Sequence, residues 1–286
     1  MSATAHDRRL VAVLGHGLVP AETPILRADD LGALRGDGIF ETMHIRDGQP
    51  WLIEAHLDRM ERSAGLLEIN LPARGELLDL AKTILSEWNP ATEGALRLVC
   101  TRGPEGGGVP TVYATVAPIA ASVVDARRNG IRVATISLGF GADARSGAPW
   151  LLGGAKTLSY AVNMASQRWA LAHGVDDVLW MSADGFALEG PTSTLVWLTG
   201  DRLWTVPVDR TGILSGTTAA WLLAHAGDLG WTSGYRMVTP AELITADGVW
   251  LTSSVRGPAE IRAIDGAERP PSPFTSAIVN LLGFPV

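Results

Sequence analysis

Two residues with complementary chemistry occur in the middle of this chain. They are Lys156, within Gly-Gly-Ala-Lys-Thr-Leu-Ser-Tyr, and Glu189, within Leu-Glu-Gly-Pro-Thr-Ser-Thr. A lysine beside small residues can form a Schiff base with an aldehyde cofactor, and a carboxylate can hold the positive ring nitrogen of that cofactor. Most lysines are exposed surface residues, so Lys156 taken alone is predicted to be a surface lysine. Together the two side chains suggest pyridoxal phosphate, which also needs a phosphate-binding site.

Two hydroxyl-rich segments have the chemistry of a phosphate-binding site. Ser215-Gly216-Thr217-Thr218 opens an expected helix, where backbone amides and the helix dipole favour an anion. Thr252-Ser253-Ser254 follows an expected strand and supplies further hydroxyls. Helix or turn capping is the commoner role for either segment alone. Their presence in the same chain as the lysine and the carboxylate favours the cofactor, because pyridoxal phosphate needs all of these contacts.

Other glycine-rich segments do not match nucleotide-binding motifs. A Walker loop needs glycine immediately before its lysine and a second glycine at the start of the motif. Ala155 and Trp150 occupy those positions. Gly36-Asp37-Gly38 lacks the third glycine of a dinucleotide fingerprint, and no lysine or helix directly follows the glycine triplet at 106–108.

The composition excludes several classes of function. The hydrophobic fraction is 47% and the charged fraction 19%, which suit a globular protein, and the net charge of −7 argues against a nucleic-acid partner. Cys100, the only cysteine, is expected to be a buried structural thiol in a strand. The six histidines show no metal-binding spacing, so no metal site is expected. Without a bilayer-spanning apolar run or a signal peptide, we expect a cytoplasmic protein with no membrane partner.

Apolar periodicity and turn signals predict an α+β or α/β fold with two domains. The first domain, over residues 1–120, is expected to have antiparallel strands at 39–46, 95–101 and 112–118, and helices at about 54–67 and 77–85. A small-residue stretch at 118–125 is interpreted as a link. The second domain, over residues 121–286, is expected to contain a helix at about 159–173, helices opening at Gly216 and Thr239, and strands at 178–181, 187–188, 194–198, 202–206 and 249–252.

Three arginines are candidates for binding an anion. Arg59 lies opposite the apolar stripe of its expected helix, so periodicity predicts an exposed side chain. Arg102, in Thr-Arg-Gly at a strand end, can bind a substrate carboxylate bidentately, although an exposed loop arginine is the commoner outcome. Arg97 is the alternative for that role, and the sequence does not decide between them.

The chain resembles the class IV, or fold type IV, pyridoxal-phosphate enzymes. This family includes branched-chain aminotransferases, D-amino-acid aminotransferases and aminodeoxychorismate lyases. The matching segments follow the family's order over about residues 30 to 266. They are Arg35-Gly36-Asp37-Gly38-Ile39-Phe40-Glu41-Thr42, Glu54-Ala55-His56-Leu57-Asp58-Arg59-Met60, Lys156-Thr157-Leu158-Ser159-Tyr160, Gly185-Phe186-Ala187-Leu188-Glu189-Gly190, Leu214-Ser215-Gly216-Thr217-Thr218 and Leu251-Thr252-Ser253-Ser254.

The resemblance implies a role for each matching residue. Lys156 corresponds to the Schiff-base lysine and proton carrier, Glu189 to the acid on the pyridine nitrogen, and Tyr160 to the phenol near the ring hydroxyl. Arg59 falls where the family places its phosphate-binding arginine, which overrides the exposure predicted from periodicity. The other phosphate contacts are implied for Thr217, Thr218, Ser253 and Ser254. The implied fold is a small α/β domain and a larger barrel-like domain, in a homodimer.

Within the family, the chain is most similar to aminodeoxychorismate lyases of the actinobacterial type. These enzymes release pyruvate from 4-amino-4-deoxychorismate and leave 4-aminobenzoate for folate synthesis. Branched-chain enzymes usually carry Gly-Ile-Thr-Arg where this chain has Gly-Thr-Thr-Ala at 216–219. D-amino-acid aminotransferases share Thr-Arg-Gly but commonly have tyrosine in place of Phe40. We therefore expect a lyase, with either aminotransferase as the alternative, acting on a small amino substrate bound by Phe40, Thr42, Arg97 and Arg102.

Overall fold

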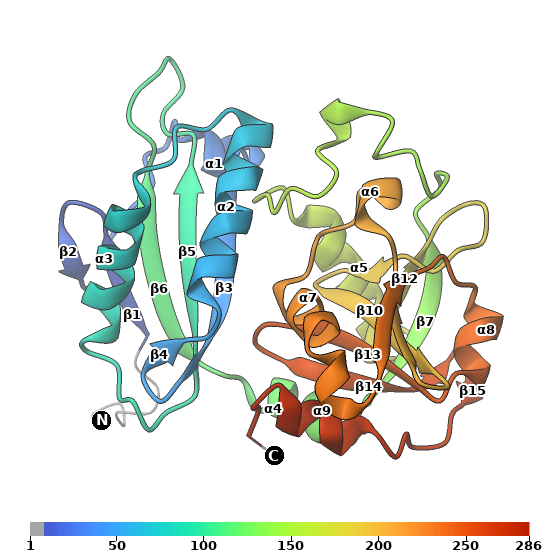
Figure 1. Cartoon of the computed structure of the whole chain (residues 1–286). Coiled ribbons are helices and arrows are strands. Elements are labelled where there is room, and N and C mark those ends of the chain that lie inside the picture. Colours follow the sequence, from blue (N-terminus) through green and yellow to red (C-terminus); the bar gives the residue numbers. More distant parts are fainter. Residues whose placement is uncertain (1–8, 286) are drawn as a thin grey trace. The chain divides into compact units, whose positions relative to one another are not determined.

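The computed structural model describes residues 9–285, which separate into two units (Figure 1). Unit 1 contains the described residues up to Ala120 together with Ala155–Tyr160. Unit 2 contains Ala121–Gly154 and the described residues from Ala161 onward. The sequence-based division after residue 120 assigned Ala155–Tyr160 to the second domain. The structure places this segment in unit 1, because it hydrogen-bonds to the edge of a unit 1 strand.

In the described part of the chain, unit 1 is an antiparallel six-stranded sheet with its two longer helices on one face. Figure 1 shows α2 (Ile53–Leu67) and α3 (Arg74–Leu85) over the same face of the sheet, and the short α1 (Leu31–Arg35) near its edge. The strand order is β2 (Gly17–Val19), β1 (Leu10–Val13), β6 (Val112–Pro118), β5 (Gly94–Thr101), β3 (Gly38–Arg46) and β4 (Gln49–Pro50).

Side-chain alternation divides the residues of β3 between the two faces of this sheet. Glu41 bonds to Arg59 of α2, so the odd-numbered residues of β3 face the helices. Phe40 and Thr42 therefore lie on the opposite face, with Arg97 as the cross-strand partner of Thr42. Two of the predicted substrate-binding side chains thus share a face with an arginine, and that face carries neither α2 nor α3.

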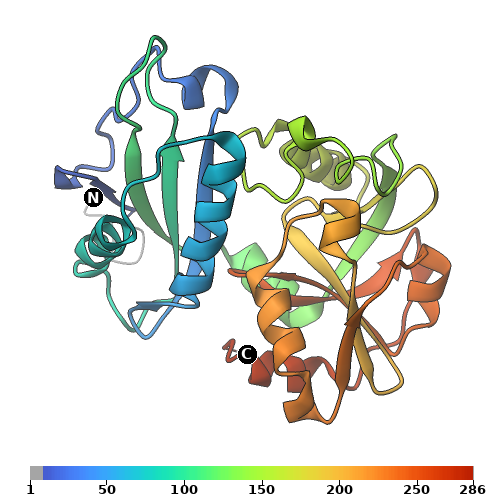
Figure 2. The same ribbon diagram turned by 45° about the horizontal axis from the view of Figure 1, so that its top comes forward.

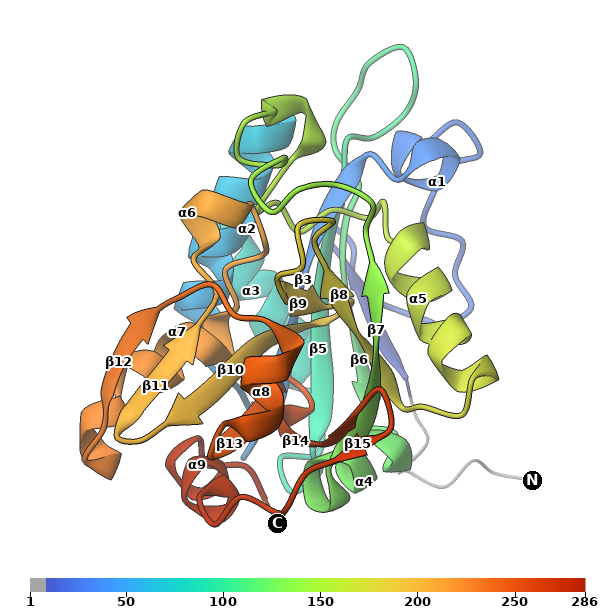
Figure 3. The ribbon, with the colours of Figure 1, turned by 90° about the vertical axis from the view of Figure 1, so that its right-hand side faces the viewer.

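Unit 2 is built on a curled sheet, which Figures 2 and 3 show from two directions. The described residues give it nine strands. Along the main path they are β12 (Thr232–Tyr235), β11 (Arg202–Thr205), β10 (Ser193–Thr199), β13 (Gly248–Ser253), β14 (Gly257–Ile264), β7 (Ile131–Ser137) and β8 (Asp177–Met181). Off this path, β15 (Ala267–Glu268) pairs with β14 and β9 (Glu189–Gly190) pairs with β10.

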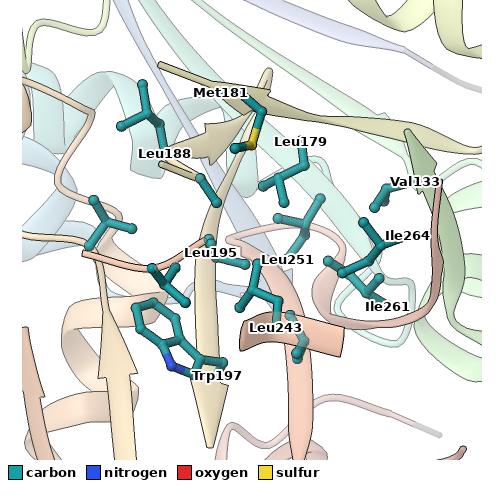
Figure 4. Close-up of a cluster of buried hydrophobic side chains, with 14 of the residues drawn as sticks. Val133, Leu179, Met181, Leu188, Leu195, Trp197, Leu243, Leu251, Ile261 and Ile264 are labelled. Carbon is teal, nitrogen blue, oxygen red and sulfur yellow. The ribbon is translucent and has the colours of Figure 1, made fainter. Parts of the chain in front are cut away.

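The ladder of unit 2 returns on itself, which makes the sheet barrel-like. Leu188 N–H donates to the Trp180 carbonyl of β8 over 2.9 Å, and Ala187 bridges Met181. The same short segment continues into β9, which pairs with β10. The barrel interior is apolar, and Figure 4 shows Leu195, Trp197 and Leu251 among the buried side chains that fill it.

The helices of unit 2 lie around this sheet. Residues interpreted as a link instead begin α4, because Ala121–Asn129 forms a helix. The helix expected at about 159–173 is α5, and Gly174 ends it with a φ of 73°. The described helices are α4 (Ala121–Asn129), η1 (Pro149–Leu151), α5 (Ala161–Ala172), α6 (Val208–Thr211), α7 (Thr217–Ala224), η2 (Ala226–Leu229), α8 (Pro240–Thr245) and α9 (Thr275–Leu281).

The segment Ala155–Tyr160 is held against the start of β3 by backbone hydrogen bonds. Phe40 N–H donates to the Lys156 carbonyl (3.1 Å), and Leu158 N–H donates to the Gly38 carbonyl (2.8 Å). A Cβ on Gly38 would lie 2.6 Å from Leu158 Cδ1 and 2.9 Å from the Cys100 carbonyl oxygen. A side chain at this position would therefore displace the Leu158 side chain and crowd the backbone of β5 at Cys100.

We expect Gly38→Ala to lower the free energy of unfolding by about 1–3 kcal/mol, because the added methyl group overpacks this contact. The matched control is Gly65→Ala on α2, where a Cβ meets nothing within 4 Å. The control should stabilise the protein by up to about 1 kcal/mol, since alanine favours a helix interior. Urea unfolding followed by tryptophan fluorescence measures both variants. Equal stability of the two would contradict the close approach.

Candidate active site

The predicted site residues fall into two sets, one in each unit. Unit 1 carries Lys156 and Tyr160 with Phe40, Thr42, Arg59, Arg97 and Arg102. Unit 2 carries Glu189, Thr217, Thr218, Ser253 and Ser254.

Two aromatic rings of unit 1 flank the amine of Lys156. The Nζ atom lies 4.3 Å from the centroid of the Phe40 ring and 5.5 Å from that of Tyr160. The two rings meet edge to face with their centroids 5.2 Å apart. An ammonium group over aromatic faces is stabilised electrostatically. The predicted Schiff-base lysine, the predicted ring-contacting tyrosine and one predicted substrate residue thus lie together.

Arg59 is buried, so the exposure predicted from periodicity is wrong. The residue is 4% exposed. The Nε atom donates to Glu41 Oε1 and Nη2 donates to Glu41 Oε2, each over 2.7 Å. His56 Nδ1 lies 2.6 Å from Glu41 Oε2. Arg59 can be buried although it lies outside the apolar stripe of its helix, because the Glu41 carboxylate of β3 compensates its charge.

Charge balance in this cluster sets the protonation of Glu41 and His56. Burial alone would raise the pKa of Glu41, but the charge and hydrogen bonds of Arg59, with the bond from His56, lower it to about 2. Burial lowers the pKa of His56, and its bond to Glu41 opposes that change only in part. At neutral pH the Glu41 carboxylate is therefore ionised, and it accepts a hydrogen bond from the Nδ1–H of a neutral His56 imidazole.

The two candidate carboxylate-binding arginines have different surroundings. Arg102 is engaged by its own unit, because Nε donates to Asp37 Oδ2 (2.8 Å) and its two terminal nitrogens donate to the carbonyls of Leu67 and Glu68. It therefore caps the end of α2. Arg97 is exposed, donates to Thr42 Oγ1 (3.3 Å) and lies with its Cζ 5.6 Å from the Phe40 ring. Only Arg97 shares the surroundings of Lys156.

In unit 2, Glu189 is held at the end of the strand that closes the barrel. It is 7% exposed, and Oε2 accepts the backbone N–H of Leu214 over 3.3 Å. Oε1 lies 3.4 Å from Arg145 Nη1. Arg145 was not predicted as a site residue, and its loop position gives no periodic signal. The carboxylate is thereby oriented by two elements of the same unit.

The predicted phosphate contacts of unit 2 gather at the start of α7. Thr217 Oγ1 and Ser254 Oγ lie 3.1 Å apart. Among the described residues, Thr218 Oγ1 is a buried hydroxyl with no hydrogen-bond partner. A Cβ on Gly216 would lie 2.2 Å from Thr194 Oγ1, so only glycine leaves the backbone open here. Unpartnered donors at a helix N-terminus fit an anion. Ser253 differs, because its hydroxyl accepts the N–H of Arg256 within the turn.

Other sequence-based expectations can be compared with the described residues. Cys100 is buried, and burial raises the pKa of its thiol to about 12, so the predicted structural role fits. Among residues 9–285, no group of three or more His, Cys, Asp or Glu side chains is arranged to hold a metal ion. Within the same range, no helix has the length and apolar character needed to cross a membrane.

Comparison with known proteins gives extensive matches. The profile of amino-transferase class IV matches residues 38–264. A protein of Mycobacterium tuberculosis named bifunctional aminodeoxychorismate lyase / D-amino acid transaminase is 40% identical, over 96% of this chain and 97% of its own length. A hypothetical aminotransferase from the same organism has a solved PLP-bound form and a form with α-ketoglutarate and PMP bound. Each has a TM-score of 0.92 and 41% identity, over 96% of this chain and 97% of that one.

The lowered pKa of Glu41 predicts a loss of stability in acid. Its folded pKa of about 2 lies below the ordinary value of 4.5, so its contribution is complete above pH 4.5 and is lost as the pH falls towards 2. By pH 3 the loss is on the order of 2 kcal/mol. His56 adds to it, because its pKa is also lowered. Urea unfolding at pH 7 and pH 3 should show that the double variant Glu41→Gln/Arg59→Met loses less stability between these pH values than the unchanged protein does. Equal losses of stability would refute the assignment of the acid sensitivity to Glu41.

Thr218→Val should stabilise the cofactor-free protein by about 1 kcal/mol, because it removes a buried hydroxyl that lacks a partner. The same change should weaken pyridoxal phosphate binding by about tenfold, since one phosphate donor is lost. Thr217→Val is the comparison for stability alone: its hydroxyl pairs with Ser254, so its loss should destabilise the protein. Thermal unfolding and absorbance titration measure the two effects. Unchanged cofactor affinity in Thr218→Val would rule out the phosphate role.

Proposed function

Because the chain belongs to the class IV aminotransferases, we propose that it is a pyridoxal-phosphate-dependent 4-amino-4-deoxychorismate lyase that forms 4-aminobenzoate and pyruvate. The observation that carries the proposal is the surroundings of Lys156. Its amine lies 4.3 Å over the Phe40 ring, on the sheet face that Arg97 and Thr42 share. An amine and a guanidinium beside an aromatic ring suit an aromatic-ring precursor that bears carboxylates.

The family assignment confirms four predictions at the level of the family. The matched profile and the similar structures confirm the resemblance to class IV enzymes and the fold type IV architecture. They also confirm an enzyme with lyase or transaminase activity, and pyridoxal 5'-phosphate as its cofactor. The choice of substrate and reaction is the part that we propose.

Within this proposal, each residue set has a task toward the cofactor. Lys156 would hold the cofactor through its aldehyde group, Tyr160 would lie near the ring hydroxyl, and Glu189 would pair with the protonated ring nitrogen. Arg59, Thr217, Thr218 and Ser254 bind the phosphate, as supported by the unpartnered hydroxyl of Thr218. Ser253 is a weaker candidate, because its hydroxyl is used within its turn. When bound, the cofactor supplies an electron sink for a carbon next to the substrate nitrogen.

Substrate orientation is assigned to Arg97, Thr42 and Phe40. Arg97 is exposed and carries the charge that a substrate carboxylate needs, while Thr42 accepts one of its hydrogen bonds. Arg102 keeps its structural bonds to Asp37 and to the end of α2, which argues against its predicted substrate role. Phe40 offers an aromatic face to a six-membered ring.

Lys156 is also assigned the proton transfers of the lyase reaction. It removes the proton from the ring carbon that bears the amine, and the bond between the neighbouring ring carbon and the enolpyruvyl oxygen breaks. The proton is returned to the departing three-carbon unit, which becomes pyruvate. The substrate atoms are then fully divided between 4-aminobenzoate and pyruvate, so the reaction needs no oxidant and no amino acceptor.

A D-amino-acid transaminase is the second candidate function. The 40% identical mycobacterial relative carries both activities in its name, and the similar mycobacterial structure binds α-ketoglutarate and PMP. The residues proposed for the lyase would serve this reaction as well, because both begin with a proton shift next to the substrate nitrogen. A branched-chain substrate has less support, since Gly216 to Ala219 departs from the pattern of those enzymes.

The homodimer expected from the resemblance also belongs to this proposal. Trp150 is 80% exposed and the adjacent Leu151 is 49% exposed, so unit 2 presents apolar side chains that a second copy would cover. The cytoplasmic location stays a prediction.

The proposal is tested by supplying 4-amino-4-deoxychorismate to the cofactor-loaded protein without an amino acceptor. We expect pyruvate and 4-aminobenzoate in equal amounts, and a loss on the order of a thousandfold or more in Lys156→Ala. Lys82→Arg should be fully active, because Lys82 lies exposed on α3. No pyruvate, together with amino exchange between D-alanine and 2-oxoglutarate, would overturn the lyase and leave the transaminase. Neither product would overturn both.

A further inference from the structure

Helix α2 carries a buried polar stripe beside its apolar stripe. His56, Arg59 and Ser63 have the spacing of residues on one side of a helix, and they are 0%, 4% and 1% exposed. The apolar stripe begins one residue later, at Leu57 and Met60, which are both 0% exposed. The helix therefore buries two neighbouring rows, and only one of them is apolar.

Such a polar row is unfavourable for stability unless each group is compensated. A buried ion pair is often no more stabilising than apolar residues of the same volume, because both charges lose their hydration. The row on α2 is compensated at each position, by Glu41 at Arg59 and His56, and by backbone groups at Ser63. The directional hydrogen bonds of this row fix the orientations of its side chains, which apolar packing would not do.

Glu41 fixes the plane of the Arg59 guanidinium. Two parallel bonds of 2.7 Å join Nε and Nη2 to the two carboxylate oxygens. This bidentate fork fixes the plane of the guanidinium. His56 bonds the carboxylate in turn, with Nδ1 at 2.6 Å from Oε2. The orientation of Arg59 is therefore set by a strand residue and a helix residue together.

Ser63 joins this arrangement to the lysine. Its hydroxyl donates to the Arg59 carbonyl over 2.9 Å and accepts the backbone N–H of Lys156 over 3.0 Å. One side chain thus connects the backbone of Arg59 with that of Lys156. Both bonds lie within unit 1.

We propose that Glu41 and His56 are positioning residues that orient Arg59 for the cofactor phosphate, and that Ser63 is a positioning residue that fixes Lys156 relative to Arg59. The inference rests on the proposed function, which assigns Arg59 to the phosphate and Lys156 to the aldehyde carbon. It adds that a single row on α2 sets the spacing between these two attachment points.

The test compares the binding of pyridoxal phosphate with that of pyridoxal, which lacks the phosphate, by absorbance titration of the cofactor-free protein. Glu41→Gln should weaken the binding of pyridoxal phosphate by about tenfold or more and leave the binding of pyridoxal unchanged, because only the phosphate contact is misaligned. Ser63→Ala should weaken the binding of both ligands, since the backbone N–H of Lys156 loses its hydrogen-bond acceptor. Glu260→Gln is the matched control, a buried carboxylate of unit 2 that holds Ser272 and Thr275.

The control should change neither affinity, even where its unfolding midpoint falls as far as that of Glu41→Gln. Equal weakening of both ligands in Glu41→Gln would show a merely structural role and overturn the proposal. If Glu41→Gln does not fold, His56→Gln replaces it, because it keeps the pair of Glu41 with Arg59. It should show a smaller loss for pyridoxal phosphate alone, and no loss would overturn the proposal.

Arg59→Lys separates this inference from the proposed function. Lysine keeps the charge and loses the planar fork. The affinity for pyridoxal phosphate, divided by that for pyridoxal, should therefore fall. An unchanged ratio in Arg59→Lys and in Glu41→Gln would mean that the phosphate role of Arg59 is wrong. A fall in Arg59→Lys with no change in Glu41→Gln would leave that role standing and overturn the positioning roles.

Discussion

The pairing of Ala155–Tyr160 with the edge of β3 is the constraint on which the lysine site depends. Gly154 belongs to unit 2 and Ala155 to unit 1, so the chain enters unit 1 for only a few residues. Two backbone hydrogen bonds to Gly38 and Phe40 hold this segment. Lys156 is therefore placed against Phe40 by backbone pairing, which is less adaptable than a loop.

Both residue sets contain polar groups that an ordinary core would exclude. Unit 1 buries a carboxylate, a guanidinium and an imidazole in one hydrogen-bonded cluster, and unit 2 buries a hydroxyl without a partner at the start of α7. Departures of this kind from the apolar pattern are expected at functional sites. The buried hydroxyl at the start of α7 has the chemistry to donate a hydrogen bond to an anionic ligand.

Periodicity and turn signals were enough to predict most elements, because β3, α2 and α7 have strong local patterns. They failed where a distant residue decides the outcome. Arg59 is buried because Glu41 of another element compensates it, and the apolar stripe of α2 does not show this. Arg102 caps α2 through contacts with Leu67 and Glu68, which only the folded chain reveals. The return of Ala155–Tyr160 to unit 1 is likewise a long-range pairing without a local signal.

The central claim is that Lys156 is the residue that bonds the cofactor, and the composition makes it directly testable. The chain contains two lysines, Lys156 and Lys82, and the side chain of Lys82 is 77% exposed on α3. Borohydride treatment of the protein loaded with pyridoxal phosphate fixes the cofactor to its lysine, and peptide mass spectrometry locates it. The account predicts one pyridoxyl group per chain, on Lys156. A stoichiometric group on Lys82, or none on either lysine, would contradict it.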